Sequence, residues 1–185
     1  RYPLRFRFRG RRWLLKPLSL FPHRGWQRLC MAHNPFAPHM WRDAGRKDFA
    51  YDLVHATAFP YGFPLACALR LSRTLNIPFV LTPFLHTGNP DDPRDRTRRA
   101  YLQPALLSLA QRADCVLVQT DIERQAFLNA GVDEKRLTVQ GLGVDSVECS
   151  GGDRQATRRV WGVGNDEVIV GHLANNSEEK GTCDL

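Results

Sequence analysis

Short apolar runs alternate with longer amphipathic stretches through the middle of this chain, and this alternation constrains the fold more than any other feature. Strand-like runs occur at residues 52–55, 78–82, 114–119 and 137–140, and helical patterns occur between them at 64–75, 97–112 and 120–131. Strands alternating with amphipathic helices predict an α/β fold with a parallel, doubly wound sheet. In such sheets ligands bind beyond the carboxyl ends of the strands, at a switch point or between two domains.

Proline, threonine and glycine residues mark where these elements begin and end. Pro104 should start or kink the helix at 97–112, because its ring lacks the backbone N–H group. Thr120 and Glu123 have the spacing of a capping box, and Gly131 follows the helix that they open. A glycine-rich stretch from Gly141 to Gly152 resembles a hinge, and after it we expect a helix at 153–160 and a fifth strand at 168–171.

Positive charge is concentrated at the start of the chain. Residues 1–42 hold ten Lys and Arg residues and no acid, whereas residues 43–185 hold sixteen bases and nineteen acids, a net charge of −3. In this segment Arg5–Arg9 alternates charged and aromatic residues, as a strand with one apolar face would. Three interpretations stay open for residues 1–42: a patch on an anionic membrane surface, a nucleic-acid contact, or a loop-rich surface whose aromatic residues pack on the domain.

The composition excludes several classes of protein. No apolar run reaches the roughly 20 residues that a membrane-spanning helix needs, and no signal peptide is evident. The five cysteines are odd in number and dispersed, which argues against a disulfide framework and a structural zinc site and favours a reducing cytoplasm. We therefore expect no metal site.

Four blocks of sequence, in order, resemble family 4 glycosyltransferases, which are retaining enzymes of the two-Rossmann GT-B fold. The blocks are Asp52-Leu-Val-His55, Ile77-Pro-Phe-Val-Leu-Thr-Pro-Phe-Leu-His86, Ala113-Asp-Cys-Val-Leu-Val-Gln-Thr120 continued by Gly141-Leu-Gly-Val-Asp145, and Val170-Gly-His172 with Glu179-Lys180-Gly181. The resemblance implies a Rossmann-like N-terminal domain over residues 1–146, on the acceptor side. Residues 147–185 would then form the hinge and the first strand and loop of a truncated donor-binding domain.

The resemblance also implies roles for individual residues. Lys180, with His172 and Gly181, would bind the diphosphate of a nucleotide-sugar donor, and His86 would act near the reacting sugar and the acceptor. Gly141 and Gly143 would let the hinge approach the donor, while Asp145 would cap or orient rather than catalyse. Without the resemblance, functional and structural interpretations of His86 are equally open, and Lys180 would be an ordinary surface charge. We interpret His55, at the end of a strand, as a structural histidine.

Three departures from the family pattern affect these expectations. His172 stands where the family usually has an arginine, and a histidine lacks the guanidinium fork. The glycine-rich loop after the family's first strand has no counterpart, so we expect that first strand to precede Arg1. The glutamate pair that holds the donor's ribose and sugar would follow Leu185, so we expect the 185 residues alone to be inactive and to gain no thermal stability from nucleotide-sugars.

The leading hypothesis is a retaining hexosyltransferase in the full-length protein, using a nucleotide-sugar donor, a glycan or lipid-linked acceptor, and no metal or other cofactor. It would work in glycolipid or surface polysaccharide synthesis, in the cytoplasm, with an anionic membrane surface as a candidate partner of residues 1–42. The alternative is a basic module that binds nucleic acid or a membrane surface without catalysis. Nucleic acid is not expected as a partner, because residues 43–185 are net acidic. The arginine cluster at 94–99 is either a solvated helix start or a contact for an anionic acceptor such as a lipid diphosphate.

Overall fold

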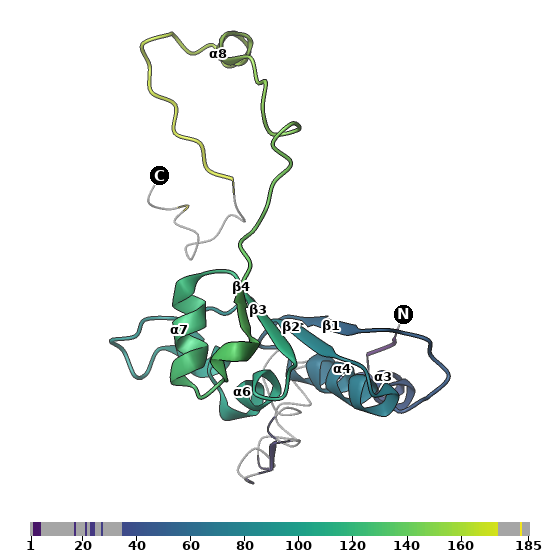
Figure 1. Ribbon diagram of the computed structural model, residues 1–185. Coiled ribbons are helices and arrows are strands. Elements are labelled where there is room, and N and C mark those ends of the chain that lie inside the picture. Colours follow the sequence, from purple (N-terminus) through teal and green to yellow (C-terminus); the bar gives the residue numbers. More distant parts are fainter. Residues whose placement is uncertain are drawn as a thin grey trace. The chain divides into compact units, whose positions relative to one another are not determined.

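A computed structural model describes residues 2–4, 17, 21, 23, 24, 27, 35–173 and 182 of the chain (Figure 1). The chain divides into two compact units, Arg1–Leu142 and Gly143–Leu185. The strand that alternation predicts at Arg5–Arg9, most of the basic segment 1–42, and the predicted donor contacts Lys180 and Gly181 lie outside the described residues.

The first unit is built on a four-stranded parallel sheet. Its strands, in the spatial order β1-β2-β3-β4, are Val54–Thr57, Phe79–Thr82, Cys115–Val118 and Leu137–Val139. Val54 pairs with Phe79, Val80 with Cys115, and Val116 with Leu137. Each strand begins within two residues of its predicted start, so the α/β fold with a parallel sheet is confirmed.

The described helices of this unit are α3 (Pro38–Asp43), α4 (Gly62–Leu75), α5 (Arg96–Tyr101), α6 (Pro104–Ala110) and α7 (Asp121–Asn129). Helices α4, α6 and α7 pack on one face of the sheet, and α3 packs against α4 (Figure 1). A strand order that follows the chain order explains this, because right-handed crossovers that all step in one direction place their helices on the same side. The doubly wound arrangement that we expected, with helices on both faces, is therefore not what the described residues form.

The strand register divides the sheet residues between two different environments. Leu81 and Val116 are paired neighbours on the helix-covered face, where both are fully buried with Leu65 of α4, Leu106 of α6 and Phe127 of α7. Side chains alternate between faces along a strand, so His55, Thr57, Val80, Thr82, Cys115 and Thr138 lie on the opposite face. That face mixes polar residues with Val80 and Leu117, and within the described part of the chain most of its residues remain half-buried or exposed.

The helix predicted at 97–112 forms as two helices, α5 and α6. Gln103 adopts an extended conformation before Pro104, which occupies the first turn of α6, so the proline does start a new helix. Two further elements were not predicted: α3, which also has a proline in its first turn, and the 3₁₀ turn η2 at Glu134–Arg136 before β4.

The predicted cap of α7 forms with a small difference in its partner. The Thr120 side chain accepts a hydrogen bond from the Glu123 backbone N–H at 3.2 Å, as in a capping box. The Glu123 carboxylate accepts from the N–H of Gln119, one residue before the position that a capping box uses. The helix ends at Asn129, and Gly131 follows it with a positive φ of 77°.

The described residues of the second unit are organised by one helix, α8 (Arg154–Trp161), which the Asp153 side chain caps and Gly162 ends in a left-handed conformation. Arg158 is buried and donates hydrogen bonds to the carbonyl groups of Gly164 and Glu167 in the following loop. The strand predicted at 168–171 does not form. A strand needs a neighbour for its backbone hydrogen bonds, and the described residues of this unit contain none, so Val168 is 89% exposed.

Candidate functional site at the carboxyl ends of the strands

The four parallel strands end at the same edge of the sheet, and backbone hydrogen bonds join the loops that follow them. The Phe59 N–H after β1 donates to the Pro83 carbonyl after β2 at 2.8 Å. The Gln140 N–H after β4 donates to the Val118 carbonyl at the end of β3 at 2.7 Å. These bonds hold the loops as neighbours, so residues from different parts of the sequence come together at this edge.

His86 lies on the loop after β2 and is exposed. The preceding Leu85 is buried in the core, and the His86 ring contacts the Tyr101 ring of α5 edge-on, with 4.9 Å between ring centroids. Phe84 has a positive φ of 49° and is 39% exposed. A non-glycine residue in that region costs on the order of 1–2 kcal/mol, and such strain is concentrated at functional sites. The structure therefore presents His86 on a firmly held loop at the strand ends.

Gly88 brings the end of the same loop against the start of α5. It has a φ of 64°, and a Cβ atom there would lie 2.7 Å from the Arg98 backbone nitrogen and would overlap the Asp95 carboxylate. No other residue fits this approach. The segment from His86 to Gly88 therefore runs along α5 in close contact with it.

His55 lies one residue inside β1, on the face of the sheet opposite the helices. Its Nε2 atom is 2.8 Å from the Thr82 hydroxyl oxygen, and this hydrogen bond joins β1 to β2. The interpretation of His55 as a structural histidine with a partner agrees with this contact.

The hinge residues occupy open positions. Gly141 lies one residue before the end of the first unit and Gly143 begins the second, and a Cβ atom at either would meet no described residue within 4 Å. Packing among the described residues therefore does not require glycine at either position. The Asp145 carboxylate accepts the N–H groups of Val147 and Glu148 at 2.9 and 3.1 Å, which is the geometry of a capped turn.

His172 belongs to the second unit, and its Nε2 atom lies 3.3 Å from the Thr182 hydroxyl oxygen. This contact joins the two ends of the segment that carries Glu179, Lys180 and Gly181. Because those three residues lie outside the described part of the chain, the diphosphate contacts of Lys180, Gly181 and His172 stay predictions.

Comparison with known families decides what kind of domain this edge belongs to. The family model of the glycosyl transferase 4-like domain matches residues 1–143. The chain belongs to that family. No curated protein matches the chain significantly. The match includes the whole sheet and His86, so the first unit is a glycosyl transferase 4-like domain with a Rossmann-like parallel sheet, and the protein is a transferase of this family.

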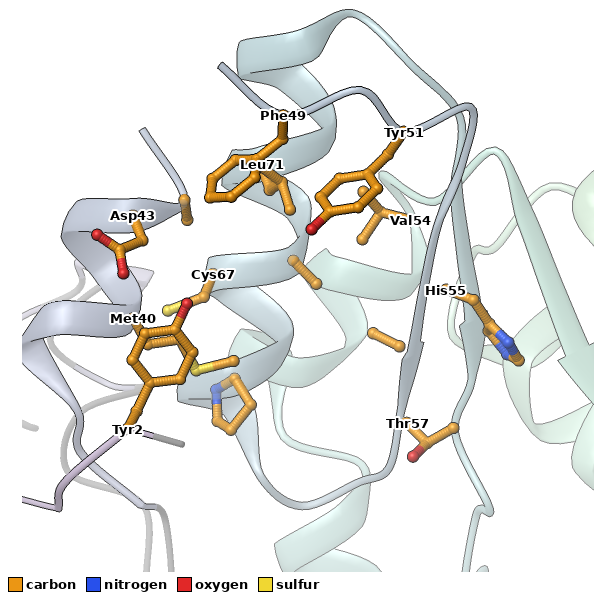
Figure 2. A pocket seen from close by; sticks show the side chains of 14 residues that line it. Tyr2, Met40, Asp43, Phe49, Tyr51, Val54, His55, Thr57, Cys67 and Leu71 are labelled. Atoms are coloured by element: carbon orange, nitrogen blue, oxygen red, sulfur yellow. The ribbon is translucent and has the colours of Figure 1, made fainter. Parts of the chain in front are cut away.

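The glycosyl transferase 4-like domain also contains a pocket that sequence reasoning missed (Figure 2). It has a volume of about 450 Å³ and lies among α3, α4 and β1, beside Tyr2, Asp43 and a stacked pair formed by Phe49 and Tyr51. The His55 side chain points to the other side of β1 (Figure 2). Because α3 was not predicted, no signal in the sequence indicated that these residues would surround one space.

The walls of this pocket are largely apolar, and burial perturbs two groups in it. It raises the pKa of the Cys67 thiol to about 12. Burial, followed by the charge of Asp43, raises the pKa of the Tyr2 hydroxyl. Both groups are therefore protonated near neutral pH, which makes neither a nucleophile there.

The described residues offer no metal site and no membrane span. Within them, no group of three or more His, Cys, Asp or Glu residues is placed to hold a metal ion. In the same part of the chain, no helix is both long and apolar enough to cross a bilayer. Metal-independent chemistry stays a prediction, as does the location of the protein in the cytoplasm or on a membrane face.

Proposed function

We propose that the full-length protein transfers a sugar from a nucleotide-diphospho-sugar to an acceptor hydroxyl group with retention of configuration. The observation that carries this proposal is the placement of His86. It is exposed at the carboxyl ends of the strands, anchored by Leu85 and Tyr101, in a glycosyl transferase 4-like domain. An imidazole there can donate or accept a hydrogen bond from the reacting sugar or the acceptor.

The donor contacts belong to the second unit. Lys180, with His172 and Gly181, would neutralise the charge that develops on the departing diphosphate, a role that requires no metal ion. In a front-face displacement the bond from the anomeric carbon to the diphosphate breaks, the acceptor oxygen bonds to that carbon on the same face, and a diphosphate oxygen takes the acceptor's proton. Gly141, Gly143 and Asp145 would shape the hinge beside the donor.

The acceptor in this proposal is a glycan or a lipid-linked glycan. The ten basic residues in 1–42 favour an anionic membrane surface next to the acceptor-side domain. We therefore propose synthesis of a glycolipid or a surface polysaccharide, with the protein in the cytoplasm and peripheral on the inner face of the cell membrane.

The test uses the natural full-length protein with a panel of nucleotide-sugars and lipid-linked or free glycan acceptors. Acceptor-dependent release of nucleoside diphosphate is measured, and the anomeric coupling constant of the product shows whether configuration is retained. His86→Asn should lower kcat/KM by about 100-fold, whereas His39→Asn on α3 should leave it unchanged. Full activity of His86→Asn, or a product of inverted configuration, would contradict the proposal.

The donor contact is tested in the same assay. Lys180→Ala should lower kcat by about 100-fold or more, while Lys135→Ala, on η2 before β4, serves as the matched control. Equal losses in the two variants would mean that Lys180 contributes only general positive charge.

A further inference from the structure

Four arginines lie in helix α5 or just before it, and none of them has an acidic partner among the described residues. They are Arg94, Arg96, Arg98 and Arg99, and residues 94–99 contain a single acid, Asp95. The carboxylates of Asp92 and Asp95 accept the backbone N–H groups of Arg94 and Arg98 at 2.8 and 2.6 Å. These two acids are thus engaged with the backbone, and within the described part of the chain the four guanidinium groups form no ion pair.

One of these arginines lies on the face of α5 that contacts the His86 loop. Tyr101 meets the His86 ring, and Arg98 precedes Tyr101 by three residues, a spacing that places two side chains side by side on a helix. Gly88, two residues after His86, lies directly against the backbone nitrogen and Cβ of Arg98. Two independent contacts therefore place Arg98 next to the segment that carries His86.

Arg99 provides a natural comparison on the same helix. It precedes Tyr101 by two residues, and side chains two residues apart do not face each other on a helix. Arg99 has the same charge and is exposed, and its spacing from Tyr101 places it away from the face that contacts His86.

We propose that Arg98 binds an anionic phosphate or diphosphate group of the acceptor, close to the hydroxyl that receives the sugar. A guanidinium group can bind two phosphate oxygens at once through its parallel N–H groups. Arg94 and Arg96 add positive charge around that contact, which outweighs the charge of Asp95. This inference rests on the proposed function, because it places the anion on the acceptor beside His86 and leaves the donor diphosphate to Lys180.

The first test measures binding alone and does not depend on catalysis. Inorganic pyrophosphate is titrated into the 185-residue chain by calorimetry, and the ring resonances of His86 are followed by NMR. We expect saturable binding with a shift of the His86 signals. Arg98→Gln loses a charge-assisted contact, so its affinity for pyrophosphate should fall about tenfold or more. Arg99→Gln loses only a charge outside the contact, so its affinity should fall less than about twofold. Arg98→Lys, which keeps the charge but loses the fork, should fall between these two variants.

Several outcomes would overturn the inference. These are no saturable binding, equal losses in Arg98→Gln and Arg99→Gln, or binding that leaves the His86 signals unchanged. Circular dichroism and thermal unfolding of each variant show that it is folded. If Arg98→Gln does not fold, Arg98→Lys still tests the contact, because it keeps the positive charge and loses the paired N–H groups of the guanidinium.

The second test distinguishes the two sources of the phosphate, using the full-length protein. One arm offers a soluble sugar phosphate, and the other offers a polyprenyl-diphosphate-linked sugar in phosphatidylcholine vesicles, with a neutral methyl glycoside as the common control. Arg98→Gln should raise KM for the phosphorylated acceptor about tenfold without changing transfer to the glycoside. The inference would be overturned if the protein transferred sugar to the glycoside as fast as to both phosphorylated acceptors. If it transferred sugar to none of the acceptors but still bound pyrophosphate, the result would count against the proposed function instead.

Discussion

Different interactions stabilise the two units of this chain. In the first unit, apolar side chains from four strands and three helices form one core, and many of them, such as Leu81 and Phe127, have no exposed surface. In the described part of the second unit, the aliphatic side chains of Val147, Val160 and Val168 are each more than 80% exposed. The buried guanidinium group of Arg158 instead donates several hydrogen bonds to backbone carbonyl groups. A sheet provides a surface on which helices can bury their apolar faces, whereas a single helix and a loop must depend on hydrogen bonds.

The largest expected effect tests the core of the first unit. Phe79→Ala removes a fully buried ring from β2, so the free energy of unfolding should fall by about 3–5 kcal/mol. Val160→Ala on α8 should change it by less than about 0.5 kcal/mol, since that side chain is exposed. Urea unfolding followed by circular dichroism measures both. Similar losses in the two variants would show that the units do not differ in how they are stabilised.

The next effect concerns the hydrogen bonds of the second unit. Arg158→Ala leaves the carbonyl groups of Gly164 and Glu167 without their donor, so α8 and its loop should lose about 1–3 kcal/mol of local stability. Amide hydrogen exchange should accelerate in residues 154–167 and remain unchanged in the sheet. Arg159→Ala, an exposed neighbour on the same helix, is the control. Unchanged exchange around α8 would mean that something other than Arg158 orders this unit.

A smaller effect compares the helix caps of the two units. Thr120→Ala and Asp153→Ala each remove an N-cap and should each cost about 1 kcal/mol. In the first unit this loss should lower the urea midpoint of the whole sheet, because α7 belongs to the common core. In the second unit it should reduce only the helicity of α8. A global loss from Asp153→Ala would show that the two units unfold together.

A further effect, similar in size to the loss of a cap, depends on pH and on Cys67. The thiol has a pKa of about 12 in the folded protein, against an ordinary value of 9.0, because it is buried. Between these values the unfolded thiol loses its proton and the folded one keeps it, so stability falls as pH rises through this window. By pH 10 the contribution is at most about 1.4 kcal/mol. The free energy of unfolding should therefore fall less steeply above pH 9 in Cys67→Ala, and identical slopes would mean that Cys67 is not shielded from solvent.

Much of the first unit could be predicted from local sequence. The strands at 78–82 and 114–119 were recognisable because short apolar runs bounded by proline, aspartate and polar residues are typical of buried strands. Pro104 and Thr120 act within one turn of their own position, so their effects on α6 and α7 could be predicted as well.

The features that depend on distant neighbours could not be predicted. The run at 168–171 has the composition of a strand, but pairing depends on a second strand that the described residues of its unit do not contain. The position of His86 after β2 followed from the strand pattern, whereas its contact with Tyr101 and the approach of Gly88 to Arg98 exist only after α5 has packed. The pocket beside Cys67 needed α3, whose six residues show too little periodicity to be recognised.

The order of the strands has a consequence for how the sheet assembles. Each described strand after β1 pairs with the strand before it, so β2 can dock on β1 as soon as α4 has formed, and β3 and β4 can follow in turn. Once β1 and β2 have paired, no other described strand has to wait for a partner from a later part of the sequence. The sheet can therefore grow at one edge during synthesis on the ribosome, in steps of a few tens of residues, with short loops to close at each step.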